Sequence, residues 1–122
     1  MAYLIDSNIL IYSYSEEYKY LRELIINGSC VLSEISRVEV LGYHGLWKDE
    51  EAYFRDIFEY ASIIIPDQSV FDRAIEIRRT YNLKLGDSLI AATASVHNLE
   101  IYTRNLSDFK RVAGLKCVNP LH

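Results

Sequence analysis

Near its start the chain reads Tyr3-Leu4-Ile5-Asp6-Ser7-Asn8-Ile9-Leu10, a short apolar run, three polar residues and a second apolar run. The first three residues are typical of a buried strand. Asp, Ser and Asn often begin helices, because their side chains accept hydrogen bonds from the first free N–H groups. The stretch therefore predicts a strand over residues 3–5 that passes directly into a helix, with Asp6 at the junction.

The same alternation of short apolar runs and helix-like segments continues to the end of the chain. Further strands are expected at residues 30–32, 62–65, 100–102 and 116–118. Helices are expected at residues 16–26, from Ser33 or Ser36 to Leu41 or Trp47, and at 49–60, 67–81, 86–97 and 106–110. Strands that alternate with helices predict an α/β fold, in which helices flank both faces of a mostly parallel central sheet.

The composition restricts the kind of protein this can be. A chain of 122 residues, half of them apolar, is expected to form one domain with its own core. The net charge of −4 argues against nucleic-acid binding by bulk electrostatics, so any such contact must be local. Because a charge appears as early as Asp6 and no apolar run approaches the roughly 20 residues of a membrane span, we expect a soluble, cytoplasmic protein. Cys30 and Cys117 fall in apolar runs and are expected to be reduced, buried thiols.

Four acidic residues lie at ends of predicted strands or near starts of predicted helices: Asp6, Glu39, Asp87 and Asp108. In open parallel sheets ligands bind beyond the carboxyl ends of the strands, and the topology brings these segments to one rim. Carboxylates gathered there repel one another unless a cation lies between them. The sequence therefore favours a phosphodiesterase that depends on Mg²⁺ or Mn²⁺.

Each acidic residue also has an ordinary structural explanation. Asp6 is a good helix cap, and Asp87 favours the positive end of a helix dipole. Ser36-Arg37-Val38-Glu39 has the form of a capping box, and Glu34 lies nearer the strand end than Glu39 does. Taken together, however, independent caps would gather three or four carboxylates at one rim only by coincidence.

Four longer patterns and a short tail follow one another along the chain: Asp6-Ser7-Asn8-Ile9-Leu10-Ile11, Ser33-x-Ile35-Ser36-x-x-Glu39-x-Leu41-Gly42, Leu83-x-Leu85-x-Asp87-x-Leu89-Ile90-Ala91-Ala92-Thr93-Ala94, Thr103-Arg104-Asn105-x-x-Asp108-Phe109 and Asn119-Pro120. In order and spacing they resemble the PIN domain family, in particular the VapC toxin subunits. The resemblance covers nearly the whole chain, and the third pattern is its most specific part.

The resemblance implies that residues 1–122 form a single PIN domain with a Rossmann-like, three-layer fold. It implies a Mg²⁺- or Mn²⁺-dependent endoribonuclease with Asp6, Glu39 and Asp87 as its acidic core. It also implies a homodimer and a VapB-like antitoxin that inserts a segment into a groove beside the active site.

The chain departs from the family pattern at two positions. Ser7 stands where Thr is usual, which keeps the hydroxyl. Asn105 stands where many PIN domains carry a fourth acid, so that either Asp108 takes over or the site works with three acids. The predicted catalytic and metal-binding residues are Asp6, Glu39, Asp87 and Asp108. The residues predicted to orient these carboxylates or the substrate are Ser7, Asn8, Thr103 and Asn105.

Substrate contacts are expected from cationic side chains near these acids. The candidates are Arg37, Arg78, Arg79, Lys84, Arg104, Lys110 and Arg111. About half of them are expected to be ordinary solvated residues. Arg37 and Arg104 are the preferred RNA contacts because they flank proposed ligands. The histidines are expected at the surface, away from the chemistry: His44, His97 and His122.

Aromatic residues crowd the first half of the chain beyond what one small core needs. We expect a partner surface on the first helices and residues 38–54, for an antitoxin or a second subunit. Two other functions stay open: an RNA-processing PIN nuclease without an antitoxin, and an inactive PIN module that only binds RNA or protein. The second is kept open by Asn105. A response-regulator receiver is disfavoured, because the chain lacks that family's Asp and Lys in order.

Overall fold

The computed structural model describes residues 1–121, which contain a five-stranded sheet in the order β3-β2-β1-β4-β5. Each neighbouring pair of strands runs parallel. The strands are β1 (Tyr3–Ile5), β2 (Cys30–Ser33), β3 (Ser62–Ile64), β4 (Glu100–Tyr102) and β5 (Cys117–Val118). The expected parallel α/β sheet is confirmed, with β1 at its centre.

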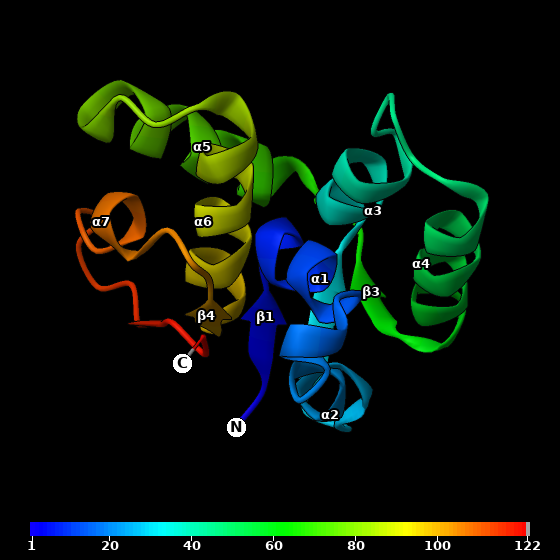
Figure 1. The fold of residues 1–122 in the computed structure, drawn as a ribbon. Coiled ribbons are helices and arrows are strands. Elements are labelled where there is room, and N and C mark those ends of the chain that lie inside the picture. The colour runs from blue at the N-terminus through cyan, green and yellow to red at the C-terminus, as the bar shows by residue number, and fades with distance from the viewer. Residues whose placement is uncertain (122) are drawn as a thin grey trace.

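Helices occupy the connections between the strands. They are α1 (Ser7–Ser13), the 3₁₀ helix η1 (Glu16–Tyr18), α2 (Leu21–Ile26), α3 (Glu34–Leu41), α4 (Lys48–Tyr60), α5 (Gln68–Tyr81), α6 (Leu85–His97) and α7 (Leu106–Phe109). Figure 1 shows α5, α6 and α7 on one side of β1, and α3 and α4 on the other. No helix within residues 1–121 is long and apolar enough to cross a membrane.

The core consists of two clusters, one on each face of the sheet, because alternate residues of β1 point to opposite faces. Leu4 belongs to the cluster formed mainly by α5 and α6, which includes Ile77 and Ile90. Tyr3 and Ile5 belong to the cluster formed with α1 to α4. These two clusters complete the three layers and fix β1, so the residue that follows it is held rigidly.

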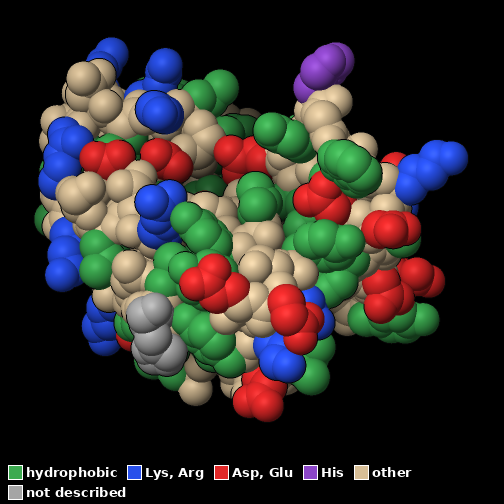
Figure 2. Space-filling view, viewed as in Figure 1, with side chains coloured by type: hydrophobic (Ala, Val, Ile, Leu, Met, Phe, Trp, Pro, Cys, Tyr) green, Lys and Arg blue, Asp and Glu red, His purple; other side chains and the backbone are tan. Residues whose placement is uncertain are grey.

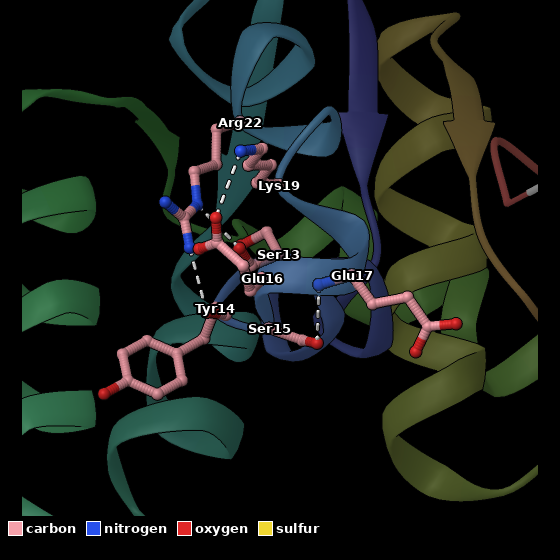
Figure 3. A network of polar contacts seen from close by, with 7 residues as sticks. All are labelled: Ser13, Tyr14, Ser15, Glu16, Glu17, Lys19 and Arg22. Carbon is pink, nitrogen blue, oxygen red and sulfur yellow. Dashed lines mark hydrogen bonds and ion pairs between the residues drawn. The ribbon is translucent and has the colours of Figure 1, made fainter.

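The prediction of one continuous helix over residues 16–26 is wrong, because the chain turns between η1 and α2. Arg22 reaches back to the end of α1, where its Nε donates to the carbonyl of Ser13 and its Nη2 to that of Tyr14, both at 2.9 Å. The Ser15 hydroxyl oxygen accepts from the Glu17 N–H at 3.2 Å. Figure 3 shows this network at the turn. Arg22 thus satisfies the last carbonyls of α1, a common role for a cation at a helix end.

The third predicted helix matches the earlier of the two expected positions at each end, with Ser33 as its cap and Leu41 as its last residue. Strand β2 continues through Ser33, whose hydroxyl oxygen accepts from the Ile35 N–H at 3.0 Å and so caps α3. Ser36 lies inside the helix and is fully buried, so the capping box with Glu39 is wrong. The helix ends at Leu41, followed by Gly42, rather than continuing to Trp47.

The remaining side chains singled out by type lie away from the rim chemistry. Cys30 is buried and Cys117 is half-buried, and both are free thiols. Burial raises the pKa of the Cys30 thiol to about 12, so it stays neutral. His44 and His97 are exposed, as expected. His122 lies outside the described residues.

Candidate active site

The site begins where β1 and β4 end side by side. Their register pairs Ile5 with Tyr102, and the Asp6 N–H donates to the Tyr102 carbonyl at 2.9 Å. The next residue on each strand therefore lies at the same level of the rim. There the Thr103 hydroxyl donates to Asp6 Oδ2 at 2.8 Å.

The Asp6 carboxylate is held by three donors and is only 4% exposed. Besides the Thr103 hydroxyl, the Ser7 N–H donates to Oδ1 at 2.8 Å and the Asn8 amide donates to Oδ2 at 3.2 Å. Asp6 is thus the cap of α1, as the capping reading predicted, and it also faces the rim. The capping role is therefore compatible with a place at the rim.

Glu39 comes to the rim from α3 and is held by the first residue of α1. The Ser7 hydroxyl donates to Glu39 Oε1 at 2.7 Å. On its other side Glu39 lies against Gly86, the second residue of α6, where an added Cβ would stand 2.6 Å from Oε2. Residue 86 must therefore lack a side chain for Glu39 to occupy this place. Sequence reasoning missed this role, for which the only available signal was a glycine beside Asp87 in an otherwise good helix.

Asp87 and Asp108 approach each other across Asn105. The Asn105 amide donates to Asp108 Oδ2 at 2.9 Å and, more weakly, to Asp87 Oδ2 at 3.5 Å. The Asn105 N–H donates to the Thr103 hydroxyl oxygen at 2.9 Å, which ties this pair to Asp6. Asp108 is also 3.6 Å from the Arg111 guanidinium.

The electrostatics show that the carboxylates affect one another. Burial raises the pKa of Asp6 to about 6, with smaller upward contributions from Asp87 and Glu39, against the lowering effect of the hydrogen bonds from Thr103 and Ser7. The pKa of Asp87 is raised by burial first, then by Asp108 and Glu39, and lowered by Lys84. A group of negative charges held in one place raises the energy of its ionised form, and a cation would relieve that strain.

The structure thus brings all four predicted acids to one rim, together with the four polar residues predicted to orient them. The two preferred RNA contacts differ. Arg37 Nε lies 2.5 Å from Glu34 Oε1, so its charge is paired. The Arg104 guanidinium lies 5.5 Å from the centroid of the Tyr12 ring, and within residues 1–121 it pairs with no carboxylate.

This fold and rim can be compared with known proteins. The model of the PIN domain family matches residues 3–115. The chain belongs to the PIN domain family. The resemblance stated from the motifs is thereby confirmed.

Individual relatives agree with this PIN domain assignment. The chain is 31% identical over 98 residues to ribonuclease VapC1 of Rickettsia felis, covering 79% of this chain and 68% of that protein. A toxin–antitoxin complex from Klebsiella pneumoniae contains a chain 33% identical, with a TM-score of 0.80 and 99% of both chains covered. VapBC2 of Rickettsia felis, bound to a DNA fragment from its promoter, has a chain 22% identical with a TM-score of 0.80 over 98% of each, and this likeness shows the fold alone.

The donors in this PIN domain are suited to a hard divalent cation. Carboxylate and amide oxygens are the ligands that Mg²⁺ and Mn²⁺ prefer. Within residues 1–121, however, no three acidic, His or Cys side chains stand close enough to form a ready-made metal site. Ser7 holds Glu39 and Asn105 holds Asp108. The chemistry of the donors fits such an ion, whose charge would offset the repulsion between the carboxylates.

The burial of Asp6 predicts that metal-free protein loses stability as the pH rises. Its pKa is about 6 in the folded chain against an ordinary value of 3.8, so the folded state holds this proton more tightly. The resulting stabilisation is full below the lower value and is lost as the pH passes the higher one. In EDTA, the unfolding free energy of the wild type should fall by about 1 kcal/mol more than that of Asp6→Asn between about pH 5 and about pH 7.5. Urea unfolding at both pH values measures this, and parallel pH profiles would contradict it.

Proposed function

We propose that this chain is a metal-dependent endoribonuclease, the toxin component of a type II toxin–antitoxin pair, acting through its single PIN domain. It hydrolyses RNA phosphodiester bonds with Mg²⁺ or Mn²⁺ held at the carboxylate rim. The observation that carries the proposal is the buried Asp6 at the end of β1, whose pKa is raised by burial and, to a smaller extent, by the charges of Asp87 on α6 and Glu39 on α3. The names of relatives at 31% and 33% identity, a ribonuclease and a toxin–antitoxin complex, support it.

In this proposal Asp6 and Asp87 hold the cation, with Glu39 as a direct or water-mediated ligand and Asp108 as the fourth carboxylate. The ion supplies Lewis acidity, which activates water and offsets charge on the phosphate. The neighbouring side chains position the carboxylates. Their contacts are those described for Ser7, Asn8, Thr103 and Asn105. Such supporting hydrogen bonds typically contribute 10- to 100-fold in affinity or activity.

The partner is proposed to be a VapB-like antitoxin, and the active form a homodimer. An apolar hollow of about 330 Å³ lies between α1, α3 and α4, lined by Ile11, Val40, Tyr43, Leu46, Glu50 and Phe54. Beside it Trp47 is 76% exposed and Tyr43 65% exposed. Large exposed aromatic residues next to an apolar hollow are typical of protein interfaces. The hollow lies on the expected partner surface of residues 38–54 and the first helices.

The proposal is tested by incubating the purified chain with a pool of structured and single-stranded RNAs in Mg²⁺, in Mn²⁺ and in EDTA. We expect cleavage with either metal, none in EDTA, and inhibition by the product of a small neighbouring gene. Cleavage that no neighbouring protein inhibits would indicate an RNA-processing nuclease instead. Folded, inhibitor-free protein that cuts no RNA in either metal would contradict the nuclease and favour a binding module.

A further inference from the structure

The Lys and Arg side chains of this chain fall into three groups. Five of them pair with carboxylates: Lys19, Arg37, Arg55, Arg73 and Arg111. Arg22 instead donates to the carbonyls at the end of α1. The others form no ion pair within residues 1–121: Lys48, Arg78, Arg79, Lys84, Arg104, Lys110 and Lys116. Cations without partners are the ones free to contact a polyanion.

The free cations are not spread evenly over the molecule. Residues 1–65 carry five Lys and Arg against eleven Asp and Glu, whereas residues 66–122 carry eight against six. Figure 2 shows Lys and Arg gathered mainly over the side of α5, α6 and α7, and acidic side chains mainly over α2 and α4. An RNA strand would therefore approach a chain of net charge −4 from the α5–α7 side.

Three free cations lie on one side of the carboxylates, at the turn from α5 to α6. Arg78 and Arg79 are in the last turn of α5, and Lys84 comes directly before α6. Lys84 is near enough to lower the pKa of Asp87. An open hollow of about 460 Å³ lies at the arginine pair, lined by Ile75, Arg78, Arg79 and Asn82.

Arg111 fixes this turn against the helix that carries Asp108. Its guanidinium donates to the Tyr81 carbonyl at the end of α5 and lies 3.6 Å from Asp108. The end of α5 and the rim are therefore joined through one side chain. Lys110 follows the last residue of α7, and its charge lowers the pKa of the Cys117 thiol on β5, against the larger raising effect of burial.

Arg104 provides a further free cation, which lies beside α1 rather than at the turn from α5 to α6. It lies between Thr103, bonded to Asp6, and Asn105, bonded to Asp108. Its N–H donates to Asn8 Oδ1 at 3.3 Å, and its guanidinium is held over the Tyr12 ring. The Tyr12 ring positions the guanidinium without neutralising it, and guanidinium groups bind phosphate and stack on bases.

From this arrangement we infer that one RNA strand crosses the carboxylate rim between two cationic sides: Arg78, Arg79 and Lys84 on one side, and Arg104 on the other. The strand's phosphates contact these four residues on either side of the bond that is cut. This inference rests on the proposed ribonuclease function, but RNA binding can be measured without cleavage. Contacts limited to a few cations also explain how an acidic protein can hold RNA.

The test is binding of a labelled single-stranded RNA of about twelve nucleotides, within the usual site size for single strands. Fluorescence anisotropy in EDTA, at a series of KCl concentrations, gives the affinity and its salt dependence. Arg78→Ala/Arg79→Ala, Lys84→Ala and Arg104→Ala should each weaken binding by about 3- to 10-fold or more, and lower the slope of log K against log salt by roughly 0.7 per charge removed.

The matched control is Lys48→Ala/Lys116→Ala, which also removes two free cations. Lys48 begins α4. Lys116 directly precedes β5, so it lies at the amino ends of the parallel strands, the opposite end from the rim. This control should leave affinity and slope unchanged. Equal weakening in the control, or no RNA binding by the wild type, would overturn the inference.

Tyr12→Leu keeps the Arg104 charge, so it should lower affinity about 2- to 3-fold with an unchanged salt slope.

Two further outcomes separate this inference from the proposed function. Charge-dependent RNA binding at the named residues without cleavage in any metal would contradict the proposed nuclease and support the inferred RNA contacts. Cleavage whose KM is unaffected by all four substitutions would support the proposed nuclease and contradict the inferred RNA contacts.

Discussion

Asp6→Asn and Asp87→Asn are each expected to lower kcat/KM for RNA cleavage by about a thousandfold, which corresponds to about 4 kcal/mol of transition-state stabilisation. Each change keeps the shape of the side chain and removes its negative charge. The loss should therefore appear in catalysis rather than in folding. Single-turnover cleavage in Mg²⁺, with circular dichroism of the same samples, measures both.

The matched control is Asp56→Asn, the same chemical change at an exposed position on α4. It should leave cleavage within about twofold of wild type, because surface charges contribute little. Metal-free Asp6→Asn should in addition be at least as stable as wild type at neutral pH, since the buried charge is gone. Full activity in either rim variant would exclude that carboxylate from the site.

Gly86→Ala is expected to reduce cleavage by about 10- to 100-fold while leaving the unfolding free energy unchanged or higher. Gly86 lies in α6 without a positive φ, so alanine suits its backbone and is the better helix former. The new Cβ would stand 2.6 Å from Glu39 Oε2, and only the end of that flexible side chain has to move. The carboxylate is thereby displaced from the rim at no cost to the core.

The control for this change is Gly28→Ala, where an added Cβ meets nothing within 4 Å. It should cleave RNA at the wild-type rate. Urea unfolding and cleavage assays on both variants separate the two effects. A Gly86→Ala protein with normal kcat/KM would show that the position of Glu39 is not important for the reaction, and would shift its role towards structure.

The parts of the fold that follow from local pattern could be predicted from the sequence. The strand at residues 3–5 and the helix after Asp6 are local, because an apolar run and a capping residue determine both. Parallel strands also have their carboxyl ends at one rim of the sheet, so the convergence of the acids could be expected from topology.

What the sequence could not supply depends on contacts between distant residues. The expected helix over residues 16–26 is interrupted between η1 and α2, and Arg22 of α2 bonds back to carbonyls at the end of α1, a contact that no local pattern indicates. The choice of Ser33 rather than Ser36 as the cap of α3 depends on how far β2 extends in the sheet. The ion pair of Arg37 is by contrast local, because Glu34 lies three residues before it on α3. The place of Arg104 over the Tyr12 ring depends on the fold and could not be read from the sequence.

The hydrogen bond between Asp6 and Thr103 joins residues 97 positions apart. During synthesis the first acidic residue therefore leaves the ribosome well before the strand that orients it. At about 5–20 residues per second, this interval is on the order of 5–20 s. A nascent chain has no assembled rim during that time, so under the proposed function the messenger being translated would meet only an incomplete site.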